Sequence, residues 1–237
     1  MSILKIRPVE VLVIALIMLS AWTTSLMAGN FNVGLTYSGV AAYVKGDEKL
    51  KTTGVTTKGD AVHTLQIPSL FLEYNTGEMT SAADGWVWGV DVIPLQAQIV
   101  EEQRQVNDQI AAYDTLTSKN INSVSQKVKA DLKWHTMAYV ETPGVLGGFY
   151  LKGGVQMAQI RTREQLGTGA TYPNAEIRGA TVGLGFKKYL GNLFTRLEGS
   201  WSQYERIDLK SRNSDAVTTV TAKPQIGQVR FSIGVAF

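Results

Sequence analysis

Nine ionisable side chains fall at alternate positions within apolar segments of the chain, and both signs of charge are represented. They are Asp91, Lys133, His135, Glu141, Lys152, Lys187, Arg196, Glu198 and Arg230. Alternate residues of a β-strand point to the same face, so each should lie opposite its apolar neighbours. Because charges in a low-dielectric interior are costly unless they are paired, we predict a buried network of ion pairs and hydrogen bonds. A narrow pathway for ions or small solutes, lined by the same residues, is the alternative.

The two histidines, His63 and His135, give little support for catalysis. A histidine that activates a nucleophile needs a positioned serine and an acidic residue to orient it. His135 is followed by Thr136 and Met137, so the His-x-Ser arrangement of barrel lipid deacylases is missing. The sequence has no cysteine, no histidine cluster and no Asp-rich loop, so we predict no metal and no cofactor. We therefore expect a protein that is not an enzyme.

The strands that would position these residues follow from the period-two alternation of apolar side chains. We expect eight, at residues 31–44, 63–74, 86–99, 123–142, 149–163, 178–189, 193–209 and 229–237. Within the third strand the apolar phase shifts by one residue near Pro94, which predicts a β-bulge. The connectors alternate between three shorter turns and four long polar loops, expected near 45–62, 101–121, 164–177 and 210–223.

The N-terminus predicts an exported protein. Lys5 and Arg7 precede the apolar run 11–19, and small and polar residues follow as far as Ala28. This is the pattern of a secretory signal peptide, so we expect residues 1–28 to be cleaved and 29–237 to form a single domain. An uncleaved N-terminal anchor is the alternative. The formal net charge of +3 argues against a nucleic-acid partner.

The closing segment has two distinct faces. Large apolar residues at the odd positions from Val229 to Phe237 alternate with Arg230 and with small residues. One face suits lipid and the other suits a barrel interior. With the eight alternating segments, the order of the loops and the terminal aromatic residue, the chain resembles the small eight-stranded outer-membrane β-barrel proteins of bacteria, the OmpA/OmpX type.

This resemblance implies an all-β, eight-stranded antiparallel up-and-down transmembrane barrel in the bacterial outer membrane. It also implies that Phe231 and Phe237 form a C-terminal signal for the barrel-assembly machinery, with periplasmic chaperones acting during export. Aromatic residues near strand ends are expected at the two membrane interfaces. They are Trp86, Trp134, Phe149, Trp201 and Phe237. A soluble lipocalin-like barrel or a periplasmic β-sandwich is the alternative, but soluble barrels pack apolar residues inward.

Basic residues gather in the first and last of the expected long loops. They are Lys45, Lys49, Lys51, Lys58, Lys210, Arg212 and Lys223. Such residues could contact the phosphates of lipopolysaccharide, or they could form an ordinary solvated rim, since acidic residues lie among them. We expect a monomer in contact with outer-membrane lipid, with a structural, envelope-integrity or surface-interaction role. The alternatives are a small porin-like channel and, less favoured, a lipid or peptide hydrolase at the barrel rim.

Overall fold

The computed structural model describes residues 30–50, 56–77, 85–94, 97–106, 124–165, 172–211 and 218–237, so the predicted signal peptide at 1–28 lies outside the described residues. The described part is all-β. Its strands are β1 (Phe31–Leu50), β2 (Thr56–Asn75), β3 (Val87–Ile93), β4 (Ala97–Val106), β5 (Val124–Glu141), β6 (Phe149–Gln165), β7 (Ala175–Leu190), β8 (Leu193–Tyr204), β9 (Ile207–Lys210) and β10 (Thr218–Ala236). Within these ranges no helix is long and apolar enough to cross a membrane.

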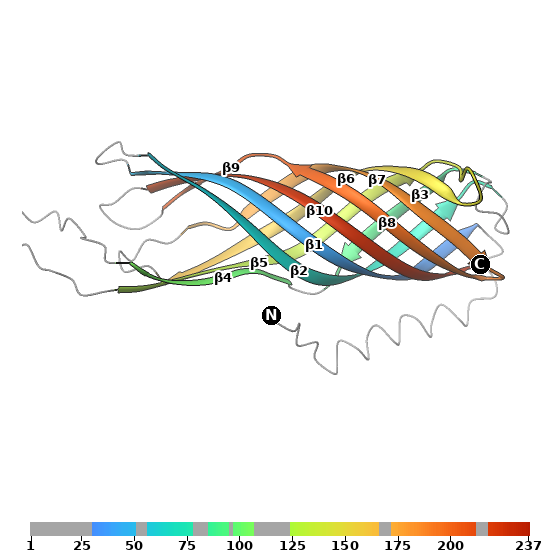
Figure 1. Ribbon diagram of the computed structural model, residues 1–237, viewed down its shortest axis with the longest axis horizontal. Coiled ribbons are helices and arrows are strands. Elements are labelled where there is room, and N and C mark those ends of the chain that lie inside the picture. The colour runs from blue at the N-terminus through green and yellow to red at the C-terminus, as the bar shows by residue number, and fades with distance from the viewer. Residues whose placement is uncertain are drawn as a thin grey trace, which may run out of the picture.

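The strands form one sheet that closes on itself as a barrel (Figure 1). Neighbours are antiparallel in the order β1-β2-β3-β5-β6-β7-β8-β10, and β10 pairs with β1 from Asn32↔Ala236 to Leu50↔Thr218. β4 continues the pass of β3, and β9 continues that of β8, so the chain makes eight passes. The predicted eight-stranded antiparallel barrel is confirmed. Closure leaves no unpaired edge between the first and last passes, as a sheet in lipid requires.

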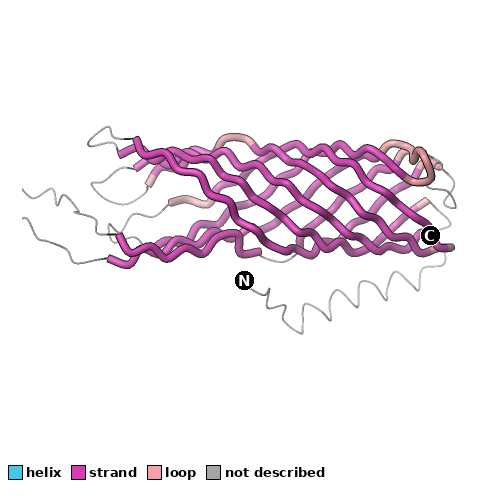
Figure 2. Tube along the Cα trace, viewed as in Figure 1, coloured by secondary structure: helices cyan, strands magenta, loops and turns pink. Residues whose placement is uncertain are grey.

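The two ends of the barrel differ (Figure 2). At one end, which we call the turn end, the Phe237 amide donates a hydrogen bond to the Phe31 carbonyl at 2.9 Å. The tight β7–β8 hairpin also lies there, and its Gly191 has a φ of 65°. Such a positive φ is what two-residue hairpin turns require. At the other end, the extended end, β1, β2, β9 and β10 continue together as a twisted sheet.

The pairing register fixes the width of the barrel. Paired positions lead from Val33 on β1 through Leu72, Val90, Ala138, Val155, Ala180, Gln203 and Gln225. Gln225 pairs with Tyr43, so one circuit returns to β1 ten residues beyond Val33. With a rise of about 3.3 Å per residue and about 4.8 Å between strands, this stagger tilts the strands by about 40°. A barrel of this strand number is just wide enough inside for side chains to fill it.

The third pass contains the predicted slip. Its pairing with β5 moves from Ile93↔His135 to Ala97↔Leu132 across Pro94, so the pass holds one extra residue there, and a further register shift lies between Gln98 and Val100. Proline has no backbone N–H to donate to the sheet ladder, and because the ladder is interrupted at Pro94, no donor is needed there.

Another bulge, which the alternation of the sequence does not predict, lies in β5. The pairing of β5 with β6 shifts between Lys133 and Thr136, and Trp134 has a φ of 57°. The shift breaks the alternation of β5, so that Leu132 rather than Lys133 packs with the interior apolar residues.

The expected long loops prove shorter because strands extend into them. β1 and β2 pair as far as Lys49↔Thr56, so most of 45–62 is a hairpin. β4 reaches into 101–121, β6 and β7 occupy both ends of 164–177, and β9 and β10 enter 210–223. Beyond the apolar band both faces of a strand are polar, so alternation gives no signal there, while threonine still favours strands. Residues 51–55, 107–123, 166–171 and 212–217 lie outside the described residues.

The outer wall of the barrel is apolar around its circumference. Large side chains from all eight passes are each about half exposed or more, Trp134 on β5 among them. They include Tyr37, Leu72, Trp88, Val155, Val182, Leu197, Val229 and Ile233. Proteins dissolved in water rarely expose a continuous apolar surface of this kind. The wall therefore suits the hydrocarbon of a bilayer.

Inside the barrel, aromatic rings lie across from glycines. Tyr139 faces Gly89 on the neighbouring strand, and Tyr150 faces Gly185. A Cβ at either glycine would overlap the ring opposite. The missing side chains thus give the narrow interior the space to hold two buried tyrosines, and both tyrosines contribute to the site described next.

Candidate functional site in the barrel interior

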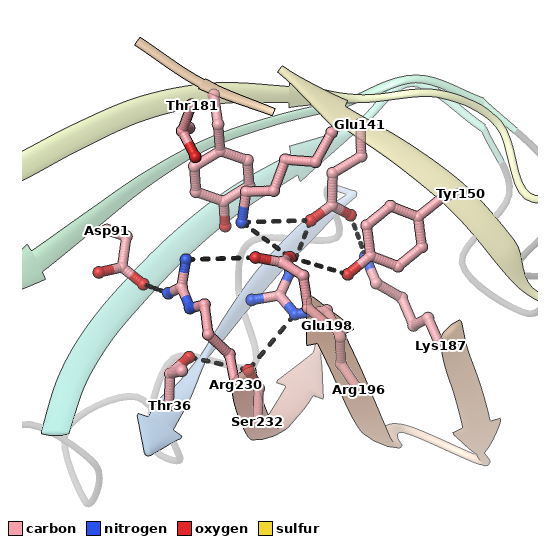
Figure 3. A network of polar contacts seen from close by, with 12 residues as sticks. Thr36, Asp91, Glu141, Tyr150, Thr181, Lys187, Arg196, Glu198, Arg230 and Ser232 are labelled. Carbon is pink, nitrogen blue, oxygen red and sulfur yellow. Dashed lines mark hydrogen bonds and ion pairs between the residues drawn. The ribbon is translucent and has the colours of Figure 1, made fainter. Parts of the chain in front are cut away.

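Eight ionised side chains meet inside the barrel, in the half nearer the turn end. Figure 3 shows part of this set. Four are carboxylates and four are cations, and each residue is at most 4% exposed. They come from every pass except that of β1. The carboxylates are Glu73 on β2, Asp91 on β3, Glu141 on β5 and Glu198 on β8, and the cations are Lys152 on β6, Lys187 on β7, Arg196 on β8 and Arg230 on β10. We call these eight residues the charge network.

Arg196 lies at the centre of one half of the charge network. Its Nη1 pairs with Glu73, and the same nitrogen lies 2.7 Å from Glu141 Oε1. Lys187 Nζ lies 2.8 Å from Glu141 Oε2 and 3.4 Å from Glu73 Oε2. Two carboxylates therefore share two cations, and neither carboxylate depends on a single partner.

Arg230 organises the other half. It pairs with Asp91 through Nη2, and its Nη1 lies 3.4 Å from Glu198 Oε1. Lys152 joins the halves, because its Nζ lies 3.0 Å from Glu198 Oε2 and 3.8 Å from Glu141 Oε1. All eight groups thus belong to one connected set.

Neutral groups add hydrogen bonds to three of the four carboxylates. Tyr139 donates its hydroxyl to Glu73 at 2.6 Å, and Tyr150 donates to Glu198 at 3.0 Å. Ser69 donates to Asp91 at 3.1 Å. Lys152 Nζ also lies 3.6 Å from the ring centre of Tyr139, a cation–π contact.

The physical role of this arrangement follows from its balance. Taking a charge out of water costs several kcal/mol, and only good pairing and further hydrogen bonds offset that cost. Equal numbers of opposite charges cancel inside the network, so it needs no counter-ion from solvent. The side chains also cross-link seven passes of the barrel. The network therefore acts as a polar core that fixes the passes relative to one another.

Beyond the charge network, toward the extended end, lies a cavity of about 40 Å³. His135 and Gln156 line it, and His135 Nε2 lies 3.2 Å from Gln156 Oε1 and 3.3 Å from the hydroxyl of Tyr204. His135 Nδ1 and Gln156 Nε2 are buried and have no protein partner. The cavity has room for one or two water molecules, which could satisfy these atoms, and is too small for a larger solute.

An apolar layer follows the cavity. Val40 and Ile67 pack with Leu65, Ile93, Leu132 and Ile226, and a second cluster is built on Ala158, Ile177 and Tyr204. Leu132 and Ile226 contact both clusters. A solute moving along the axis would meet this layer as well as the charge network.

The structure brings together six of the eight residues singled out as a lumen polar network. They are Asp91, Glu141, Lys152, Arg196, Glu198 and Arg230, and Lys187 joins them. His135 lies in the separate cavity layer. The inward placement predicted for Lys133 is wrong: the β5 bulge turns it away, and its Nζ lies 5.8 Å from the centre of the exposed Trp134 ring.

Sequence reasoning missed Glu73. The signal was present, because Glu73 alternates with Leu72 and Tyr74, and both of those residues are exposed on the outer wall. Phe71, which is buried on the inner face, interrupts the apolar-out pattern of this strand, so alternation alone does not mark Glu73 as inward. Apart from alternation, nothing in the sequence marks Tyr139 and Tyr150 as hydrogen-bond donors to the carboxylates.

The aromatic residues expected at membrane interfaces occupy the outer wall. Trp86, Trp134, Phe149 and Trp201 are exposed, and Phe237 is half-buried at the turn end. Trp86 and Phe149 belong to the turn end, whereas Trp134 and Trp201 lie farther along their strands. Phe231 is 48% exposed on the outer face of β10.

Metal ligation finds no support in the described ranges, where no group of three or more His, Cys, Asp or Glu side chains could hold a metal ion. His135 contacts an amide and a phenol instead of a serine and a carboxylate. The geometry therefore supports a structural role for this histidine.

Comparison with known proteins gives fold-level similarity alone. No protein-family model and no curated protein sequence matches the chain. Among solved structures, it is similar to the outer-membrane protein OprG of Pseudomonas aeruginosa, at 14% identity and a TM-score of 0.47, covering 87% of this chain and 96% of that one. It is also similar to Neisserial surface protein A (10%, 0.39, covering 85% and 97%) and to the outer-membrane protease OmpT of Escherichia coli (10%, 0.42, covering 91% and 100%). This chain is itself a closed eight-stranded antiparallel barrel.

Proposed function

We propose that this protein is a closed, non-enzymatic barrel of the bacterial outer membrane that serves envelope integrity or surface interaction. The filled interior carries this proposal. The charge network and the apolar layer lie one after the other along the axis, and the cavity between them measures only about 40 Å³. The apolar outer wall supports a location in lipid.

A small channel for ions or solutes is the second candidate. It would need the charge network to separate, and each buried cation in it would then lose one or more carboxylate partners. Breaking a buried pair costs about 3–5 kcal/mol, and the network contains several such pairs. The closed form is therefore favoured.

The test uses the mature chain refolded in detergent. A closed barrel should migrate faster on a gel before boiling than after it, and liposomes that contain it should not swell in isotonic solutions of small sugars or amino acids. Mobility that does not change on boiling would contradict the membrane barrel. Swelling by a heat-modifiable sample would instead establish the channel.

A further inference from the structure

The outer face of the extended sheet carries a patch of charged side chains. Pairing places them in three rows across β1, β2, β9 and β10. The first row is Asp60–Lys45–Lys223, the second is Lys58–Asp47–Thr221–Asp208, and the third is Lys49–Thr219–Lys210. With Arg206 beside Thr221, these rows hold six cations and three carboxylates. We call this set the basic patch.

The basic patch lies just beyond the apolar wall. On β1, the outward side chains from Phe31 to Tyr43 contain no charge, and Lys45 is the next one on that face. Each further row adds about 5 Å along the axis, given the rise per residue and a tilt of about 40°. The first two rows, which lie about 5 Å apart, therefore fit within the depth expected of lipid headgroups, about 5–8 Å on each side of a bilayer, and the third row lies about 5 Å farther out.

The cations of the patch are incompletely neutralised within the protein. Lys45 and Lys223 lie directly opposite each other on β1 and β10, an arrangement of like charges that is destabilising by itself. Among the described residues, Lys58 and Lys223 form no ion pair, whereas Arg206 pairs with Asp208 at 2.9 Å. In the third row Lys49 and Lys210 flank Thr219 without a carboxylate between them.

The patch is also hollow. A cleft of about 420 Å³ is lined by Lys45, Lys58, Lys223 and Arg206, together with Asp47 and Asp60. A group that accepts hydrogen bonds from several of these cations would relieve the repulsion between Lys45 and Lys223. Phosphate oxygens form strong, charge-assisted hydrogen bonds with lysine and arginine.

We propose that this cleft binds the phosphorylated headgroup of an outer-leaflet lipid, because outer-membrane barrels place their short turns on the periplasmic side and their longer connections outside. Lys45 and Lys223 bridge one phosphate, and Lys58 and Arg206 line the sides of the cleft. The assignment rests on the proposed membrane location, because the position of the patch beyond the apolar wall is what selects a lipid phosphate over a soluble one. The site would hold the barrel at a defined depth in the membrane.

The experiment measures binding of diphosphoryl lipid A to the refolded mature chain in neutral detergent by native mass spectrometry. We expect the double variant Lys45→Gln/Lys223→Gln to lose roughly tenfold or more in affinity, as expected when two charge-assisted contacts are removed. Lys188→Gln is the matched control, because Lys188 is an exposed lysine near the turn end, and it should change the affinity less than twofold. Lys223→Arg should retain binding.

Two further measurements distinguish binding of a lipid phosphate from binding of soluble phosphate. The same glycolipid without phosphates should bind at least roughly tenfold more weakly, and inorganic phosphate should not displace lipid A. Three results would each overturn the proposal. They are an equal loss of affinity in the Lys188→Gln variant, equal affinity for the glycolipid with and without phosphates, and displacement of lipid A by inorganic phosphate. Gel mobility before and after boiling, recorded for every sample, shows whether a failure belongs to this site or to the membrane barrel itself.

Discussion

The interior of the barrel and the outer face of its extended end both contain many charged side chains, but the two regions differ in how far those charges are buried and paired. Inside, four carboxylates and four cations are buried in one connected network. Outside, six cations share a hollow surface with three carboxylates, and Lys58 and Lys223 have no ion-pair partner among the described residues. Balanced, buried charge cross-links the passes, whereas exposed, unbalanced charge remains available to a ligand. The contrast predicts that the same kind of substitution destabilises the barrel when made in the interior and leaves its stability nearly unchanged when made on the outer face.

Removing the central cation should have the largest effect. Arg196→Ala leaves Glu73 and Glu141 buried with fewer partners, which should lower the free energy of unfolding by about 3–5 kcal/mol. Urea unfolding of the refolded chain in detergent micelles measures this loss. Arg206→Ala, at an arginine whose side chain is 56% exposed, is the control and should leave the midpoint unchanged. Similar midpoints for the two variants would erase the distinction between the regions.

Filling the space opposite a buried tyrosine should come next. Gly89→Val places a side chain where the ring of Tyr139 lies, and displacing that ring should cost about 1–3 kcal/mol. At Gly153, on the outer wall, nothing lies within 4 Å of an added Cβ, so Gly153→Val should cost little. The same urea measurement compares them, and a tolerated Gly89→Val would show that the interior is loosely packed.

Removing one neutral donor should have a smaller effect. Tyr139→Phe deletes the 2.6 Å hydrogen bond to Glu73, which keeps Arg196 and Lys187, so we expect a loss of about 1.5 kcal/mol. Tyr37→Phe is the matched control, because the Tyr37 hydroxyl donates to Gln66 on the outer wall. If Tyr37→Phe and Tyr139→Phe lowered the free energy of unfolding equally, burial would not be what makes the Tyr139 hydrogen bond stabilising.

The smallest effect is expected at the exposed pair of the basic patch. Hydrogen bonds from Thr221 and Arg206 hold the pKa of Asp208 below its ordinary value. This contribution is present at neutral pH and disappears as the pH falls through that lowered pKa. Arg206→Gln should raise the pKa of Asp208 toward its ordinary value without a measurable change in the urea midpoint. An NMR titration of the Asp208 carboxyl checks this, and an unchanged pKa would contradict the pairing.

The sequence predicted the barrel well because the membrane forces a simple pattern on it. Alternation identified all eight passes, and Pro94 with its phase change located the first bulge. Two features of the fold could not be predicted from alternation, each for a physical reason. Outside the apolar band both faces are polar, so the extension of β1 and β2 through 45–62 could not be seen from alternation. The bulge at Trp134 reverses the faces of β5 without a proline or glycine, so Lys133 was assigned to the wrong side.

The site was predictable in kind but not in detail. Alternation selected the inward ionisable residues, yet the partners of each depend on the stagger of the passes, which brings Asp91 to Arg230 across 139 positions of sequence. The basic residues of the extended end were visible as composition alone. Their assembly into a cleft depends on strand pairing that composition does not encode.

The closed interior is the central claim, and ion conductance across a planar bilayer tests it most directly. The refolded, heat-modifiable chain should insert without producing discrete current steps, because the charge network and the apolar layer block the axis one after the other. Reproducible unitary currents from the same sample would contradict this account, since they would require an open path through both layers.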